Sequence, residues 1–213
     1  MLLHAVTSAV AAILAVAGPA WPVHPAADPP AGLQVTDVQF AGEGCLPWTA
    51  SVVPALDGRS VEVVYGSFFA QAGAVPQVDG TTSWVPRQEV GCRASFTLTY
   101  DPGWRVALRG GDSYTFADIA RGARGTVRAG HRWGTAPPAD AARTVAGPLS
   151  DGVVLRHDTG GPLTDCGAPV PVVMRKDLIV EAGTAAANSL SELAADVKSL
   201  ASHDRVHLRW ERC

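Results

Sequence analysis

Histidine is the first residue type to examine for chemistry, because its imidazole changes charge near neutral pH and binds metals. Four histidines lie beyond the N-terminal quarter of the chain: His131, His157, His203 and His207. On a helix, His203 and His207 would share a face and could hold a metal together with a carboxylate such as Asp204. The alternating pattern of residues 205–210 favours a strand instead, which would separate the two residues by roughly 13 Å along the chain. The sequence therefore predicts no metal site.

Sequence motifs for nucleophilic or nucleotide chemistry are missing. The chain contains no Gly-x-Ser-x-Gly elbow, no His-Glu-x-x-His, no Walker A loop and no Gly-x-Gly-x-x-Gly. A triad of Ser150, His157 and Asp165 can be imagined, but nearness in sequence says nothing about triad geometry. The sequence thus nominates no catalytic residue and no cofactor.

Tryptophan gives a better indication of function, because an exposed indole stacks on sugar rings or fills a pocket of a partner. Trp48 and Trp84 lie in segments flanked by proline and are our candidates for a binding surface. Trp104 and Trp210 fall on alternating apolar positions, so we expect them in the core. An extracellular glycan or protein is the kind of partner that such a surface would take.

The charge balance excludes a nucleic-acid partner. Charged residues make up 17% of the chain and the formal net charge is −3, whereas binding phosphates requires a basic face. Of the 17 basic residues, 15 are arginine. This excess can be interpreted as anion recognition or as the result of GC-rich coding. We favour the coding explanation, because the arginines are spread along the chain and no basic patch is visible in the sequence.

The chain has four cysteines, at positions that suit disulfides: Cys45, Cys92, Cys166 and Cys213. No Cys-x-x-Cys pair occurs, so neither a zinc site nor a thioredoxin-like redox site is expected. An even number of distant cysteines in an exported chain indicates disulfides. Three pairings are possible. We favour Cys45–Cys92 and Cys166–Cys213, which both span 47 residues and would each stabilise the fold by about 4 kcal/mol.

The N-terminal segment has the composition of an export signal. No Asp, Glu, Lys or Arg precedes Asp28, and the apolar run at residues 5–17 is too short to span a bilayer of about 30 Å. Ala-Val-Ala at 15–17 fits the small-x-small cleavage rule, with a second option at residue 20. We expect a signal peptide at 1–17, a Pro/Ala-rich linker at 18–32 and one secreted, extracellular domain at 33–213, with no membrane span in the mature chain.

Alternation of apolar and polar residues runs through the body of the chain and predicts strands. Strands are expected over residues 35–40, 61–69, 94–100, 104–109, 124–133, 153–157, 172–180 and 206–210. Asp-Pro-Gly at 101–103 predicts a tight hairpin between two of them. Short strands separated by Gly and Pro are typical of an all-β, antiparallel, jelly-roll-like β-sandwich, here stabilised by disulfides.

One segment near the C-terminus departs from alternation. Residues 189–201 place apolar side chains on one helical face, and Ser189 with Glu192 has the spacing of a capping box. The sequence therefore predicts one short amphipathic helix, packed against the sandwich. A helix that binds a membrane surface is the weaker interpretation, because the polar face is not basic.

An ordered set of short motifs resembles a known family. The motifs are Gly44-Cys45, Gly91-Cys92, Pro102-Gly103-Trp104, Gly147-Pro148, Asp165-Cys166-Gly167 and the closing residues 208–213. Their order resembles a domain-of-unknown-function family of small secreted, four-cysteine proteins from bacteria and fungi, over roughly residues 33–213. The apolar stretch at 189–201 and the lack of an aromatic residue beside Cys166 depart from the family pattern. The resemblance implies an exported β domain and no established activity.

Together these observations favour a non-catalytic structural or binding domain outside the cell, with binding to the cell wall or to glycans as one form of that role. Two alternatives stay open. A secreted hydrolase of extracellular polymers would need a deep pocket with convergent carboxylates or histidines. A disulfide-stabilised inhibitor of extracellular proteases would present a rigid exposed loop.

Overall fold

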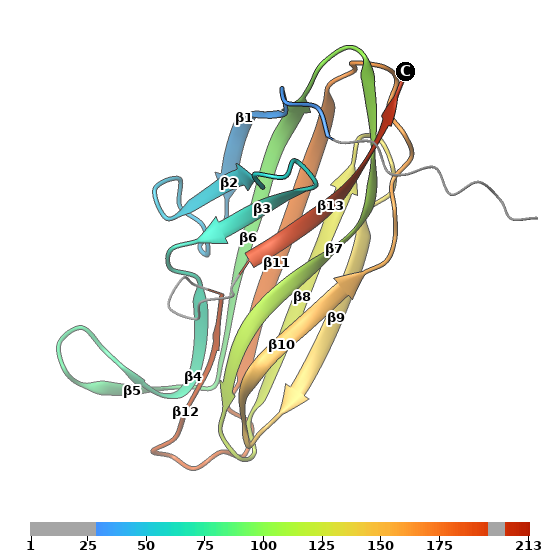
Figure 1. Cartoon of the computed structure of the whole chain (residues 1–213). Helices are drawn as coiled ribbons and strands as arrows, with labels where there is room; N and C mark the ends of the chain where they lie inside the picture. The colour runs from blue at the N-terminus through green and yellow to red at the C-terminus, as the bar shows by residue number, and fades with distance from the viewer. Residues whose placement is uncertain (1–28, 196–202) are drawn as a thin grey trace, which may run out of the picture.

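A computed structural model describes residues 29–195 and 203–213 as two antiparallel sheets packed face to face (Figure 1). The first sheet has the strand order β1 (Gln34–Ala41), β6 (Arg87–Thr99), β11 (Val170–Glu181), β8 (Arg124–Trp133) and β9 (Ala139–Ala146). All of its neighbouring strands run antiparallel. The predicted all-β, antiparallel architecture is therefore correct for the described residues.

The second sheet is built around the long strand β7 (Trp104–Ile119). One edge of β7 pairs with β10 (Leu149–His157). Its other edge pairs first with β13 (His203–Arg212) and further along with β12 (Leu190–Ala194). Beyond β13 lie β3 (Ser60–Tyr65) and then β2 (Ala50–Pro54), and beyond β12 lie β4 (Phe69–Pro76) and then β5 (Thr82–Val85).

The core lies between the two sheets and follows directly from the alternation. In β6, for example, Ala94, Phe96 and Leu98 are buried, while the residues between them are partly exposed. Trp104 and Trp210, predicted to be internal, are 6% and 4% exposed. Because the central strands β6, β8, β11 and β13 bury about every second side chain, their remaining side chains form outer faces on which a binding site can be built.

The helix predicted over residues 189–201 is wrong, because Leu190–Ala194 form strand β12. This strand lies between β4 and β7 and forms hydrogen-bonded ladders with both. Ser191 and Leu193 are 1% and 0% exposed, which is the period of a strand. Pairing on both edges thus outweighs the local helical pattern. Residues 196–202, which the predicted helix also included, lie outside the described residues.

The hairpin predicted at residues 101–103 is also wrong, although the turn itself is present. The Trp104 backbone N–H donates to the Asp101 carbonyl at 3.1 Å. Strand β6 before the turn belongs to the first sheet, however, and β7 after it belongs to the second. The turn therefore carries the chain from one layer of the sandwich to the other.

Two disulfides close the fold, and they follow the favoured pairing. Cys45 is bonded to Cys92 and Cys166 to Cys213, each across 47 residues of sequence. The Cys213 backbone N–H also donates to the Gly103 carbonyl at 3.0 Å, which fixes the end of β13 beside the start of β7. Within residues 29–195 and 203–213 we find no helix with the length and apolar character needed to cross a membrane.

Candidate functional site

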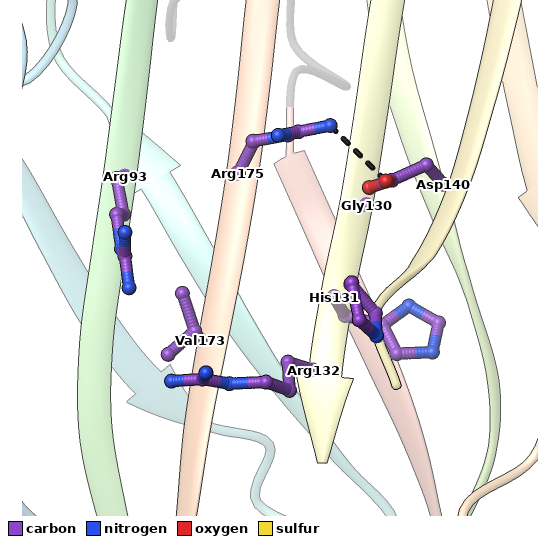
Figure 2. Close-up of a pocket in the computed structure, with 8 residues that line it drawn as sticks. Arg93, Gly130, His131, Arg132, Asp140, Val173 and Arg175 are labelled. Carbon is purple, nitrogen blue, oxygen red and sulfur yellow. Dashed lines mark ion pairs between the residues drawn. The ribbon is translucent and has the colours of Figure 1, made fainter. Parts of the chain in front are cut away.

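Three arginines from three neighbouring strands meet on the outer face of the first sheet. Arg175 of β11 lies opposite Arg93 of β6, and Arg132 of β8 lies opposite Val173 of β11. Together these residues line a hollow of about 190 Å³ (Figure 2). We call this hollow, formed by Arg93, Arg132, Arg175 and the residues between them, the arginine hollow.

One carboxylate accompanies the three guanidinium groups. Arg175 Nη2 lies 3.1 Å from Asp140 Oδ2, and both side chains are about half exposed. Figure 2 shows Arg175 extending toward Asp140, while Arg132 extends the other way, across β11. Among the described residues, Arg93 and Arg132 have no carboxylate within ion-pair distance. The hollow therefore has an excess of positive charge.

Gly130 fixes the position of the one ion pair. It lies between Arg175 and Asp140 in the sheet register. A Cβ atom at this position would come 1.9 Å from Asp140 Oδ1 and 2.8 Å from the Ala139 carbonyl oxygen. Glycine thus leaves the space in which Asp140 lies over β8 and pairs with Arg175.

The next row of the sheet contains a second acidic group. Asp177 lies opposite Arg128 and two residues beyond Arg175 on β11. Burial raises the pKa of Asp177 above its ordinary value, and the nearby Arg175 and Arg128 guanidinium groups oppose this shift. Arg132, opposite Val173, lies one row further from Asp177 than Arg93 and Arg175 do, so the excess of positive charge is greatest at Arg132.

Guanidinium groups in this arrangement recognise anions. Each one offers several N–H donors in a plane and binds a carboxylate or phosphate through two parallel hydrogen bonds. Two unpaired guanidinium groups beside a third fixed one can hold anionic groups along a polymer that crosses the strands. Because Arg93 and Arg132 are exposed, salt would weaken such binding.

The sequence reasoning missed this cluster. Arg124, Arg128 and Arg132 recur every fourth residue in β8, a spacing that places them on one face of a strand and that could have been noticed. The contribution of Arg93 and Arg175 depends on the register between β6, β11 and β8. That register is a long-range property that a scan for runs of basic residues does not detect.

A separate polar cluster lies on the outer face of the second sheet. His203 Nε2 is 3.2 Å from Asp112 Oδ2, and His207 Nε2 is 2.6 Å from Asp112 Oδ1. The hydrogen bond from His203, together with that from His207, lowers the pKa of Asp112 to about 2. A hollow of about 370 Å³ begins at His207 and extends over Arg109, Val154 and Arg156.

This cluster differs from the set of His203, His207 and Asp204 that the sequence analysis considered as metal ligands. Both histidines are on β13, as expected for a strand, but Asp204 is buried on the opposite face and Asp112 takes its place between the rings. Among the described residues, no group of three or more His, Cys, Asp or Glu has metal-binding geometry. In that same part of the chain, neither ring is hydrogen-bonded to a hydroxyl or thiol nucleophile.

The imagined triad of Ser150, His157 and Asp165 is not brought together. His157 is buried and packs edge-to-face against His131, with ring centroids 5.4 Å apart. Burial lowers the pKa of both imidazoles. No hydrogen bond joins His157 to Ser150 or Asp165 in the described structure.

The two candidate tryptophans are exposed but lie far apart in the strand order. Trp48 precedes β2 and is 79% exposed, and Trp84 lies in β5 and is 45% exposed. Strands β2 and β5 are at opposite ends of the path through the second sheet. Neither indole lines the arginine hollow, so any role of these residues in binding is a separate prediction.

Comparisons with known proteins give low similarity to solved structures. No curated protein matches. The structure of TmCBM61 in complex with beta-1,4-galactotriose is 10% identical, with 83% of this chain and 89% of that chain covered and a TM-score of 0.28. The mosquito-larvicidal Cry4Aa toxin from Bacillus thuringiensis is 6% identical over 83% of this chain and 24% of the toxin, with a TM-score of 0.31.

A third structure, the enzymatically active domain of tailspike protein 4 from bacteriophage CBA120, is 12% identical over 86% of this chain and 20% of that chain, with a TM-score of 0.20. All three scores are too low to establish a common fold. One family model matches nearly the whole described domain, over residues 31–213. On that match, the chain belongs to the family described as domain of unknown function DUF4360.

Proposed function

We propose that this domain binds an anionic polysaccharide of the cell wall or extracellular matrix, without catalysis, through the arginine hollow. The observation that carries the proposal is the pair of exposed guanidinium groups, on Arg93 and Arg132, that have no carboxylate partner among the described residues. They lie beside Arg175, whose position is fixed by Asp140. Anionic groups spaced along one polymer would satisfy both free arginines at once.

The position of the arginines on sheet strands supports this role. Arg93 and Arg175 project from the middle of β6 and β11, and Arg132 projects from near the end of β8; β11 is bonded to both β6 and β8 along its length. Side chains on a rigid sheet lose less freedom on binding than side chains on loops. A shallow hollow of about 190 Å³ open along the sheet also suits a segment of an extended chain better than a small enclosed ligand.

An extracellular location is part of the proposal. Two disulfides are consistent with an oxidising compartment, and the sequence predicts a signal peptide at 1–17, with cleavage up to residue 20, followed by a linker at 18–32. N-terminal sequencing of protein recovered from the medium should give a first residue between 18 and 21. A mature form that begins at Met1 would contradict the export signal.

The binding test compares anionic and neutral polymers. Polygalacturonate carries carboxylates, phosphomannan carries phosphates, and galactan carries neither. We expect the protein to bind at least one of the two polyanions and to bind it about tenfold more weakly after Arg93→Ala with Arg132→Ala, since an exposed ion pair contributes up to about 1 kcal/mol and tenfold in affinity is about 1.4 kcal/mol. Which polyanion binds distinguishes a uronate-containing glycan from a phosphate-containing one.

The matched control removes the same charge elsewhere. Arg156→Ala with Arg209→Ala takes two exposed arginines from the outer face of the second sheet. We expect the affinity of this variant for the polyanion to stay within about twofold of the wild type. An equal loss in both double variants would show attraction by net charge alone, and no retention on either polyanion would reject the proposed function.

Stacking of neutral sugars on Trp48 or Trp84 is a second candidate, supported by their 79% and 45% exposure. It predicts measurable binding to galactan that is lost in Trp48→Ala or Trp84→Ala and is unaffected by the arginine substitutions. Absence of galactan binding would remove this candidate while leaving the anionic one to its own test.

A further inference from the structure

An oppositely charged pair is sealed between the two sheets, away from both outer faces. Lys176 lies on β11 of the first sheet and Asp204 on β13 of the second. Their side chains are 0% and 4% exposed, and Lys176 Nζ is 3.0 Å from Asp204 Oδ1. Burying two charges costs several kcal/mol per ion, and their mutual attraction often does no better than an apolar pair. The pair is therefore unusual as a purely stabilising contact.

The surrounding groups hold the amine and the carboxyl group against each other. Lys176 Nζ also donates to the Tyr114 carbonyl oxygen at 2.8 Å. The Tyr65 hydroxyl donates to Asp204 Oδ2 at 2.5 Å. The Tyr65 ring lies 5.6 Å from Lys176 Nζ and packs edge-to-face on Phe68. The amine of Lys176 and the carboxyl group of Asp204 are thus fixed at contact distance in a site that excludes bulk water.

We propose that Lys176 and Asp204 form an intramolecular isopeptide bond, between Lys176 Nζ and Asp204 Cγ, which cross-links the two sheets. A proton first passes from the ammonium group to the carboxylate across their 3.0 Å contact. The neutral amine then attacks Cγ, the C–N bond forms and the C–Oδ1 bond breaks. Oδ1 leaves as water, with the proton it received and one proton from the nitrogen. Ammonium plus carboxylate gives amide plus one water, so no further reactant is needed.

One feature of the site favours formation of the neutral amine, and another favours its attack on the carboxyl group. Burial lowers the pKa of Lys176, which makes the nucleophilic neutral amine easier to form. The Tyr65 hydroxyl donates to Oδ2, the oxygen on which negative charge develops when the nitrogen attacks. Burial raises the pKa of Tyr65, so its hydroxyl keeps the proton that it donates.

A place for the released water lies beside the carboxyl group. A cavity of about 10 Å³ is lined in part by Ser113, His131, His157 and Asp204, a volume of roughly one water molecule. The Ser113 hydroxyl is buried and has no hydrogen-bond partner in the described structure. It can bond to the departing water as that water leaves Asp204.

Peptide mapping of the unaltered protein tests the bond directly. After reduction of the disulfides, trypsin should release residues 176–198 joined to residues 199–205, because an acylated Lys176 resists cleavage. The mass of this product should be one water less than the sum of the two peptides, and sequencing should find two amino termini in it, at Lys176 and Ser199, whereas the isomeric uncleaved peptide 176–205 has only one. Recovery of residues 177–198 as a separate, unlinked peptide would reject the proposal. Since no variant is involved, a failure of a variant to fold cannot obscure the answer.

Three substitutions then test the roles of individual groups. Lys176→Met should give no linked product. Asp204→Asn should give a linked product lighter by one ammonia instead of one water, because the side-chain amide nitrogen is then the leaving group. Tyr65→Phe keeps the ring and removes the donor, so the linked fraction should fall. An unchanged linked fraction in Tyr65→Phe would overturn the role assigned to that hydroxyl.

Discussion

At the scale of single residues, Asp112 has the clearest pH-dependent interaction. Its pKa is about 2 in the folded protein, against an ordinary value of 3.8, mainly because His203 donates to it. A depressed folded pKa contributes stability that is present above the ordinary value and is lost as the pH falls through the folded one. The contribution of Asp112 should therefore disappear between about pH 4 and pH 2.

The test is thermal unfolding from about pH 5 to about pH 2, with Asp112→Asn as the comparison. Because the side chain is 25% exposed, we expect a contribution near 1 kcal/mol after allowance for solvent screening. The variant should lose less stability than the wild type over this acid range. Parallel curves for the two proteins below pH 4 would show that Asp112 has no such role.

The buried histidines add a second pH-dependent contribution to stability, in a higher pH range. Burial lowers the pKa of His131 and His157 below 6.5. By the same sign rule, stability falls as the pH drops below 6.5, where the unfolded chain takes up protons that the folded chain resists. The Asp112 carboxylate raises the pKa of His157, so Asp112→Asn should lower that pKa further and make the loss of stability below pH 6.5 somewhat larger, whereas its effect through Asp112 itself falls below about pH 4.

At the scale of elements, strand β7 contains a bulge that positions the hollow on the second sheet. In its ladder with β13, His207 lies opposite Gly110 and Leu208 opposite Leu108, so Arg109 is the extra residue. Gly110 has a φ of 128°, and a Cβ atom there would come 2.2 Å from the His157 carbonyl oxygen. Only glycine fits both the conformation and the space.

We therefore expect Gly110→Ala to destabilise the protein by about 1–3 kcal/mol, a fall in Tm of roughly 3–10 °C for a domain of this size. Gly103→Ala is the matched control, because a Cβ atom at Gly103 would meet no heavy atom within 4 Å. The control should stay within about 0.5 kcal/mol of the wild type. Equal Tm values for the two variants would mean that the bulge tolerates a side chain.

The same scale explains what could be predicted from the sequence. The expected strand at 124–133 coincides with β8 because alternation is a local signal. β12 was mistaken for part of a helix because its strand character comes from its partners β4 and β7. The arginine hollow was missed for a related reason. Arg93, Arg132 and Arg175 become neighbours only through strand register, which depends on pairing between segments distant in sequence.

At the scale of the whole molecule, the two disulfides close loops of equal length but differ in their accessibility to solvent. Each closes a loop of 47 residues, so the chain-entropy contribution, about 4 kcal/mol, is the same for both. Their surroundings differ: Cys45 and Cys92 are 1% and 3% exposed, while Cys166 and Cys213 are exposed. Thiol–disulfide exchange requires access of a thiolate to sulfur. The Cys166–Cys213 bond should therefore be reduced first in the native protein.

Brief treatment with a thiol reductant, alkylation and peptide mass analysis should find label on Cys166 and Cys213 before Cys45 and Cys92. The molecule should remain folded at that stage. Strand β13 stays held by its ladder with β7 and by the Trp210 indole, which donates to the Gly58 carbonyl at 2.8 Å. Labelling of all four cysteines at one rate would instead mean that reduction proceeds only through global unfolding, and that the exposed bond and the buried bond open together.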